Sequence, residues 1–425
     1  MGSIPLLIGI FIVTFVLIAV EKWHRMTVTF LSAVLIVVLG YLTPSEALNY
    51  IDFNTLGLLL GMMVIVAFFR RTGFFEYIAI KAIKISKGNF ITLFFFFFML
   101  TGIVSAFLDN VTTVLIFSPI IILVASMTGI SPFPFLIGEI IASNLGGTAT
   151  LIGDPPNIII GSAAGLSFND FLVNLTLPVL FVMVVNVFVL KAMFKNQYNI
   201  LGHFDVSLVK VNERDAIKDR ALLRKVLIVF AFVIIGFILH DVFKLPPSIV
   251  ALVGAVILLF VTNQNPDEVL NEVEWTTLFF FSGLFVVVGA LEKYQIIENV
   301  ANFLIKFSGS ELGLFTIIWA LSFICTILMG AVPYTVAIVP VIQSIILKTP
   351  GINADALWWL LSLTVCFSGN TTLVSAAANL VAAGISEKTQ EKITFKNYLK
   401  YGIPVSILNV LLALLYIVIR YIVIK

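Results

Sequence analysis

The sequence predicts an all-α polytopic membrane protein of two inverted repeats, each with five membrane crossings, a re-entrant hairpin and a broken helix. Three observations predict this architecture. Long apolar runs recur along the chain, and the second half repeats the first at a constant offset. Basic residues also gather in loops that fall on one side of the expected topology.

The composition excludes a soluble protein. Of the 425 residues, 60% are hydrophobic and only 11% are charged, and the mean hydropathy is +1.12. A soluble chain needs more charged residues to cover its surface. Nearly uncharged runs of 16 to 20 residues suit helices that cross a hydrocarbon layer about 30 Å thick. The first run, residues 4–20, lacks a basic start and a cleavage site, so we expect a membrane helix rather than a signal peptide.

The first half, residues 1–195, divides into seven segments. Two plain helices precede a third helix, an amphipathic segment, a long apolar run with a polar centre, an interrupted helix and a closing helix. We expect them at residues 4–20, 27–43, 55–69, 74–87, 90–127, 133–165 and 170–194. The long run is expected to be a hairpin that enters and leaves the membrane on one side.

The second half, residues 223–425, repeats this order at an offset of 222. PSEALNYIDFNTLGLLLG (44–61) matches PDEVLNEVEWTTLFFFSG (266–283) at its Pro, Glu, Leu-Asn, Thr-Leu and terminal Gly positions. The expected segments are residues 223–240, 247–263, 276–290, 294–307, 312–347, 355–385 and 401–422. Between the halves, the polar residues 196–222 predict a cytoplasmic linker.

Basic residues indicate how the repeats lie in the membrane. With hairpins in place of full crossings, one side holds loops 21–26, 70–88, 191–225 and 386–400, which carry 19 of the 25 Lys and Arg residues. Loops 44–54 and 162–170, on the other side, carry none. Because basic loops stay in the cytoplasm, we expect an integral plasma (inner) membrane protein, multi-pass, with both termini outside. Five crossings per half also invert one half relative to the other.

Two polar stretches interrupt long helices at matched positions. Within SNLGGTATLIGDPPN (143–157), residues 146–157 align with SGNTTLVSAAAN (368–379) at the offset of 222. Unwound backbone in a membrane is tolerated only where it is buried or lines a cavity. Broken helices also present positive N-terminal ends to anions and free carbonyl groups to cations. Two matched breaks that both carry Thr and Asn therefore favour a binding site over packing alone.

Polar residues also mark the first hairpin. Its centre carries Asp109 and Asn110, whereas the second hairpin has Gly330 and Ala331 at the corresponding place. The two expected sites are therefore built alike but are not charged alike.

Three acidic residues fall at expected membrane depth, where ionisable groups are costly and usually functional: Asp109, Glu139 and Asp154. Asp154 has a structural alternative, as the cap of a half-helix that starts at Pro155. Glu139 has another, because near the inner surface water would solvate it.

The string GGTATLIGDPPN resembles the hallmark of the ion transporter superfamily. It is similar to the group of arsenical pump membrane proteins and melanosomal P-protein permeases with a citrate-transporter-like domain, which is related to divalent-anion/sodium symporters. DNVTTVLIFSP (109–119) and GNTTLVSAAANLVAAGI (369–385) also match in order, so the resemblance covers nearly the full chain. It implies a scaffold subdomain that dimerises and a transport subdomain of hairpins and broken helices, each built from both halves.

The resemblance also implies where ions bind. A coupling cation would lie between the Asp109-Asn110 tip and the break at 146–153, and a related site between 332–335 and 368–371, with the substrate between them. Gly330-Ala331 departs from the acidic-Asn pair that many members keep. The expected substrate-binding residues are Asn110, Thr112, Thr148, Thr150, Asn157, Pro333, Thr335, Asn370, Thr371, Thr372 and Asn379. The expected coupling-ion residues are Asp109, Asn110, Gly146, Gly147, Gly153, Asp154, Ser368 and Gly369, with Na⁺ at Asp109, Asn110 and Gly147.

These features predict a secondary active transporter that moves a small anion or oxyanion, arsenite-like or carboxylate-like, by elevator-type alternating access coupled to Na⁺ or H⁺. A Na⁺/H⁺ antiporter is the alternative, because the broken helices and hairpins hold no Lys or Arg to pair with the acidic groups. Helix N-termini, however, bind anions without such residues. An ion channel is a further alternative.

We expect neither an enzyme nor a bound cofactor other than the coupling ion. The sequence has no GxxxxGK[ST] nucleotide loop and no DDxxD, HExxH or GxSxG motif in a suitable setting. The expected partners are the transported ion, the lipid bilayer and a second copy of the chain, with no nucleic acid.

Overall fold

The computed structural model describes residues 3–195 and 213–423. These residues form 20 α-helices, a short 3-10 helix and a final π-helical turn, with no strand among them. The all-α prediction is therefore confirmed. Eight of the described helices are long and apolar enough to cross a membrane. Most of the expected linker, residues 196–212, lies outside the described residues.

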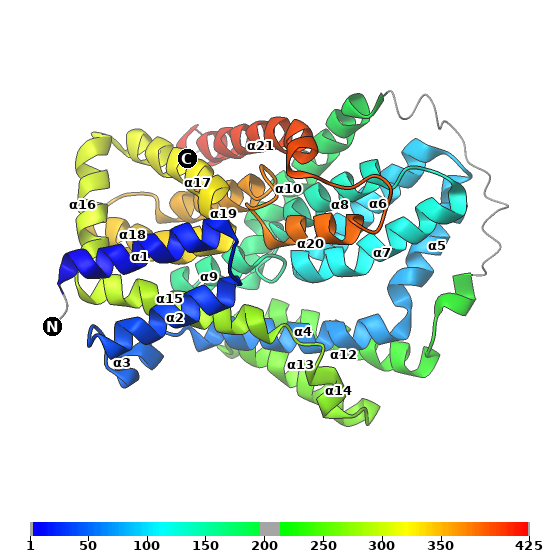
Figure 1. Cartoon of the computed structure of the whole chain (residues 1–425), viewed down its shortest axis with the longest axis horizontal. Coiled ribbons are helices and arrows are strands. Elements are labelled where there is room, and N and C mark those ends of the chain that lie inside the picture. Colours follow the sequence, from blue (N-terminus) through cyan, green and yellow to red (C-terminus); the bar gives the residue numbers. More distant parts are fainter. Residues whose placement is uncertain (1–2, 196–212, 424–425) are drawn as a thin grey trace.

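The helices of the first half follow the expected order (Figure 1). They are α1 (Ile4–Val20), α2 (Arg25–Val38), α3 (Pro44–Asn49), α4 (Phe53–Thr72), α5 (Phe74–Ser86), α6 (Phe90–Ser105), α7 (Asn110–Thr128), α8 (Phe133–Gly147), α9 (Pro155–Ala164) and α10 (Phe168–Met193). The expected hairpin consists of α6 and α7, and the interrupted helix consists of α8 and α9.

The second half contains the same series after a 3-10 turn at Glu213–Ala216. Its helices are α12 (Arg220–Phe243), α13 (Pro247–Thr262), α14 (Pro266–Leu270), α15 (Trp275–Lys293), α16 (Ile296–Ser308), α17 (Glu311–Met329), α18 (Ala331–Lys348), α19 (Ala354–Ser368), α20 (Ala377–Ser386) and α21 (Phe395–Ile417). Here α17 and α18 form the hairpin, and α19 and α20 the interrupted helix. The inverted orientation of the halves across a membrane stays a prediction.

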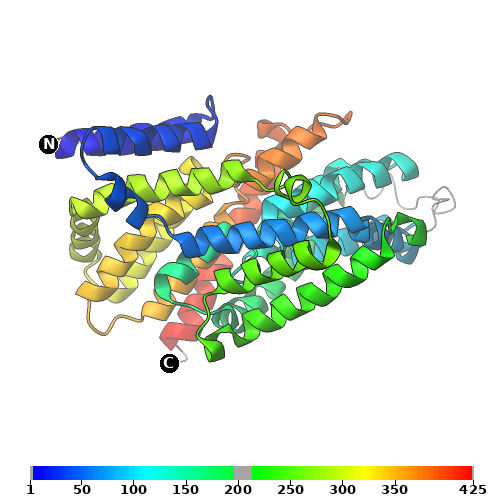
Figure 2. The ribbon, with the colours of Figure 1, turned by 90° about the horizontal axis from the view of Figure 1, so that it is seen from below.

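Helices of the two halves pack against each other in matching pairs. α4 packs on α13, and their counterparts α15 and α2 pack on each other. Likewise α7 packs on α20, and their counterparts α18 and α9 pack on each other. Figure 2 shows α1 on one face of the molecule and α12, its counterpart, on the opposite face. The half-helices after the breaks thus lie against the hairpins of the other half.

Two glycines permit the closest of these crossings. A Cβ atom on Gly61 of α4 would lie 2.6 Å from the backbone carbonyl carbon of Ala251 in α13. A Cβ atom on Gly283 of α15 would lie 2.8 Å from the backbone carbonyl carbon of Thr29 in α2. Only glycine allows so close an approach of two backbones. Both are the terminal glycines of the repeated stretch, so the repeat preserves both helix crossings.

The two hairpin tips are built differently. Asp109 caps α7, because its Oδ1 accepts the Thr112 N–H at 2.9 Å and its Oδ2 accepts the Thr112 hydroxyl at 2.5 Å. In the second hairpin, Gly330 joins α17 directly to α18 with φ of +90°, a conformation that favours glycine. The N–H of Ala331 donates to the Ser375 carbonyl at 3.0 Å, which ties this tip to the break before α20.

Two basic segments lie together at one end of the molecule. The backbone N–H of Lys218 donates to the Thr72 carbonyl at 3.0 Å, and the Lys218 side chain pairs with Glu76 of α5 at 3.3 Å. Lys84 of α5 pairs with Glu213. This proximity is what the positive-inside prediction requires of segments 70–88 and 213–225.

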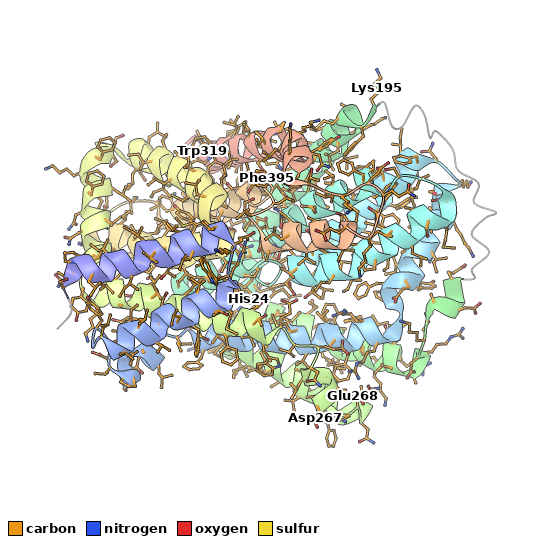
Figure 3. All side chains as sticks on the ribbon, viewed as in Figure 1. His24, Lys195, Asp267, Glu268, Trp319 and Phe395 are labelled. Atoms are coloured by element: carbon orange, nitrogen blue, oxygen red, sulfur yellow. The ribbon has the colours of Figure 1, made fainter. Side chains whose placement is uncertain are left out.

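The loop at residues 21–26 lies elsewhere. In Figure 3 His24 lies over the middle of the view, whereas Lys195 projects from the edge, and Figure 2 shows the loop between α1 and α2 on an outer face of the molecule. The helices on either side, α1 and α2, have 17 and 14 residues. Lys22, Trp23 and His24 of the connecting loop are exposed, so this loop lies at the surface of the molecule.

Candidate functional site

A cavity of about 400 Å³ lies where the hairpin tips and the helix breaks meet. Its wall includes Asn110 from the first hairpin, Asp154 from the first break, Pro333 from the second hairpin and Ser375 from the second break. The rest of the wall comes mainly from residues 21–26 and from α15. Elements from both halves and from both plain and interrupted helices therefore share one cavity.

Six helices place their first turn in this wall. They are α2, α7, α9, α15, α18 and α20. The first N–H groups of a helix have no partner within the helix, and the helix dipole gives this end a partial positive charge. The cavity wall therefore includes six helix ends with partial positive charge, of which the end of α7 is already capped by the Asp109 carboxylate and the first N–H of α18 already donates to Ser375.

Asn157 holds the first break together. Its Nδ2 donates to the carbonyl oxygens of Gly147, Thr148 and Thr150 at 3.4, 3.0 and 2.9 Å. Its Oδ1 accepts the Ser362 hydroxyl of α19, in the other half, at 2.6 Å. Three carbonyl groups of the first break thus share the amide of Asn157 as donor, while that of Ala149 accepts from the Thr176 hydroxyl.

Asn379 does the same for the second break. Its Nδ2 donates to the carbonyl oxygens of Gly369 and Thr372 at 2.6 and 2.8 Å. Both acceptors lie 222 residues after acceptors of Asn157, so the two breaks are held in the same way.

Asn144 of α8 joins the two halves. Its Nδ2 donates to Oδ1 of Asn370 and to Oδ1 of Asn379, both at 2.9 Å. Its Oδ1 accepts Nδ2 of Asn110 at 3.0 Å, and the same nitrogen of Asn110 donates to Oδ1 of Asp154 at 3.2 Å. A chain of buried amides thus runs from Asp154 in the cavity wall to the second break.

Cys366 of α19 is the counterpart of Asn144 at the offset of 222. Its thiol donates to Oδ1 of Asn157 at 3.6 Å, just as Asn144 donates to Oδ1 of Asn379. Each half therefore contacts the asparagine that holds the other half's break.

The predicted substrate-binding residues fall into two groups. Asn110 and Pro333 line the cavity. The others are buried around the breaks and hairpins and lie outside its wall: Thr112, Thr148, Thr150, Asn157, Thr335, Asn370, Thr371, Thr372 and Asn379. In this structure the buried group shapes the backbone of the breaks and hairpins.

The predicted coupling-ion glycines let backbone segments touch. A Cβ atom on Gly146 would lie 2.0 Å from the carbonyl oxygen of Gly102 in α6, and one on Gly147 would lie 2.5 Å from that of Gly153. Gly369 has more room, because the nearest such atom is 3.0 Å away. The glycines of the first break are thus required by the close backbone packing.

Asp109 and Asp154 stand beside each other at the first break. Asp154 forms no side-chain hydrogen bond that would cap α9, so the capping alternative is wrong, and its carboxylate accepts from Asn110 instead. Asp109 is half-buried, and its carboxylate interacts electrostatically with Asp154 and with Glu274 at the start of α15. Ser368, the last predicted coupling-ion residue, is buried at the end of α19.

Glu139 does not lie at a solvated surface. Only 1% of its surface is exposed, so the alternative of a water-solvated carboxylate is wrong. It lies in α8 behind the first break and outside the cavity wall.

The sequence did not point to Arg25, which lines the cavity. Arg25 pairs with Glu21, and its Nη2 donates to the Val374 carbonyl of the second break at 3.3 Å. The broken helices and hairpins carry no Lys or Arg apart from Lys348 at the far end of α18, but α2 brings a guanidinium to the cavity. The signal for Asn144 was present, since it is a polar residue of the quoted stretch 143–157 within a buried helix.

Sequence comparisons show which proteins this chain is similar to. The sequence profile described as "Citrate transporter" matches residues 15–364. The chain is 38% identical to a 46 kDa membrane protein of Mycobacterium leprae over 98% of each chain. It is 37% identical to an uncharacterized transporter of Mycobacterium tuberculosis, over 97% of this chain and 98% of that one. It is 31% identical to the P protein of Mus musculus, over 100% of this chain and 60% of the P protein.

A solved structure shares the fold. The crystal structure of the Alcanivorax borkumensis YdaH transporter matches with a TM-score of 0.59 and 15% sequence identity, over 91% of this chain and 88% of that chain. At this identity the likeness concerns the fold alone. Together the matches confirm the resemblance that rests on GGTATLIGDPPN.

Proposed function

Because the chain belongs to the citrate transporter family, we propose that this multi-pass membrane protein is a secondary active transporter of a small anion or oxyanion, coupled to Na⁺ or H⁺. The substrate is arsenite-like or carboxylate-like. The proposal rests on one observation, the cavity whose wall includes the first turns of six helices.

The cavity wall supports binding of an anion. Helix N-termini offer N–H donors and a favourable potential to negative charge. Arg25 adds a permanent positive charge with several donors. Glu21 neutralises part of this charge, which leaves the helix ends as the larger contribution.

The first break supports binding of a cation. The carboxylates of Asp109 and Asp154 interact electrostatically, and Asn110, whose Nδ2 donates to Asp154, adds an amide oxygen to the same tip. Oxygen ligands of this kind suit Na⁺. A cation here would neutralise the acidic pair, so that the anion meets less repulsion, and this provides a physical reason for coupling.

Elevator-type movement is the mechanism we propose. The transport unit comprises α6–α9 and α17–α20, and the scaffold comprises α1–α4 and α12–α15. The contact between Arg25 and the Val374 carbonyl joins scaffold to transport unit, so it must break when the unit moves.

A Na⁺/H⁺ antiporter is the second candidate. The observation that favours it is that Asp154 accepts a hydrogen bond from Asn110 and pairs with no Lys or Arg among the described residues. Such a carboxylate can exchange H⁺ for Na⁺ without an anion.

Orientation and assembly complete the proposal. Both termini lie outside, the linker lies in the cytoplasm of a cell whose plasma membrane holds the protein, and two copies associate. Exposed apolar side chains such as Phe232 and Phe260 cover α12 and α13, as expected of surfaces that meet lipid or a second scaffold. Labelling of single cysteines from either side and cross-linking in native membranes test these points.

Thermal stability of the purified protein tests the main proposal. A ligand of the folded state raises the unfolding temperature by mass action. Citrate, dicarboxylates and oxyanions are added with and without Na⁺ at two pH values. We expect an anion to stabilise the protein when Na⁺ or a lower pH supplies the cation, and Asp109→Ala to abolish the effect. Asp267→Ala, at the molecular edge in Figure 3, is the control that should keep it.

Other results point elsewhere. Stabilisation by Na⁺ or Li⁺ alone, stronger at higher pH and without an anion effect, would favour the antiporter. Downhill flux in liposomes that neither saturates nor depends on a second ion would favour a channel.

A further inference from the structure

Glu139 in α8 is an acidic side chain that the proposed cation site does not use. It is almost fully buried. The Ser118 hydroxyl of α7 donates to its Oε2 at 2.7 Å, whereas its Oε1 has no hydrogen-bond partner among the described residues. A carboxylate without water and without a cation is strongly disfavoured. The neutral acid therefore suits this position.

The neighbouring helices supply no charge that would compensate a carboxylate. α8 packs against α6, α7, α10, α19, α20 and α21. The titratable side chains on these helices are Asp170, Lys191, Asp355, Cys366, Lys396, Tyr398, Lys400, Tyr401 and Tyr416, with Asp109 at the cap of α7. None of them pairs with Glu139, whose one polar contact within the described chain is Ser118.

The pair formed by Glu139 and Ser118 is separate from the cation site but is connected to it. Glu139 lies five residues before Asn144 in α8, which is roughly 7.5 Å along the helix axis. Ser118 precedes Pro119, which has no N–H to donate to the Leu115 carbonyl.

We propose that Glu139 is a proton-binding site distinct from the site at Asp109 and Asp154, and that it takes up and releases one proton per transport cycle. This inference rests on the proposed transport function. While buried against Ser118, Glu139 keeps its proton. When the transport unit moves and water reaches the carboxyl group, the O–H bond breaks, the proton passes to water, and a carboxylate remains. On the opposite side the carboxylate takes a proton from water and the O–H bond forms again.

The test compares the full-length protein with Glu139→Gln, which keeps the size of a neutral acid and an oxygen that accepts from Ser118. Infrared spectra in lipid near neutral pH should show the C=O stretch of a buried protonated carboxyl group. Because Asp154 is also buried and can contribute to this band, we expect the band to lose the Glu139 component in E139Q and to keep its full intensity in E298Q, the matched change of an exposed glutamate on α16. In proteoliposomes E139Q should lose the pH dependence of anion transport while it keeps anion-dependent thermal stabilisation.

The outcomes separate the two proposals. A band of unchanged intensity in E139Q, or a pH profile equal to that of the unsubstituted protein, overturns the proton site. If E139Q does not fold, Ser118→Ala replaces it: a shift of the band supports the site, and an unchanged band overturns it. If no anion stabilises the unsubstituted protein, the transport proposal fails, and the infrared band still decides whether Glu139 holds a proton.

Discussion

Nδ2 of Asn144 donates a hydrogen bond of 2.9 Å to Oδ1 of Asn379, which lies 235 residues later in the other half of the chain. Asn379 in turn holds the carbonyl groups of the second break. In the opposite direction, Ser362 of the second half donates to Asn157, which holds the first break. The two breaks therefore form one hydrogen-bonded unit, and we expect them to move together.

Asn144→Ala should destabilise this unit. The substitution removes the donor for Asn370 and Asn379, and each buried polar group left without a partner costs about 1–3 kcal/mol. We expect a lower unfolding temperature and weaker anion-dependent stabilisation. The control is Asn299→Ala, on the exposed face of α16. If N144A and N299A unfold at the same temperature, the hydrogen bonds of Asn144 do not contribute to the stability of the protein.

Gly61→Ala and Gly283→Ala should each strain a helix crossing. A methyl group at either position meets the backbone of the facing helix, and overpacking of this kind costs about 1–3 kcal/mol. Thermal unfolding of both variants measures the loss. Gly9→Ala in α1 is the control, because a Cβ atom there meets nothing within 4 Å. Stability of G61A equal to that of G9A would contradict the close approach.

The pairing of Glu46 with Lys293 predicts an acid-dependent contribution to stability. Hydrogen bonds from Lys293 and then from Thr43 lower the pKa of Glu46 from its ordinary 4.5 to about 2. Because the folded-state pKa is the lower one, the pair stabilises fully above pH 4.5, and the contribution is lost as the pH falls toward about 2. Glu46→Gln should therefore be less stable than the unsubstituted protein near neutral pH, with a difference that shrinks across this window.

Thermal unfolding of both proteins over that pH range measures this difference, with Asp267→Asn as the control. If the stability difference between the two proteins is the same at all pH values, the ionisation of Glu46 does not contribute to stability. The corresponding residues 222 positions away, Glu268 and Arg71, are also paired, at 3.5 Å.

Arg25→Gln should weaken anion binding. A hydrogen bond from a charged donor contributes about 1.5–3 kcal/mol, which corresponds to an apparent Kd raised about tenfold or more. Anion titrations followed by thermal stability or calorimetry measure the change. Lys22→Gln is the matched control, since Lys22 belongs to the same loop but does not line the cavity. If R25Q and K22Q bind the anion with equal affinity, Arg25 does not contribute to anion binding.

The sequence predicted those features that depend on local pattern. Apolar runs locate the helices, and polar residues within such runs locate the hairpin tips and the breaks. The offset between Asn157 and Asn379 identified the two breaks as a pair. These features can be predicted from the sequence because each depends on residues that are close together in the chain.

Features that depend on packing between distant segments were missed. Arg25 reads as a loop residue because nothing near it in sequence shows that it contacts the Val374 carbonyl of the second break, 349 residues later. Asn144 has partners up to 235 residues away, so its polarity was visible but its role was not. The burial of Glu139 depends on the six helices that pack against α8.

The reciprocal helix crossings at Gly61 and Gly283 suit an ancestor that was a dimer of two single halves. Each half contributes one glycine and one receiving helix, so the interface is isologous, as in a homodimer with twofold symmetry. A gene for a single half could therefore have encoded a functional ancestor that assembled from two copies. The present chain should also tolerate being made in two pieces cut within 196–212, and recovery of both pieces through a tag on one of them would measure their reassembly.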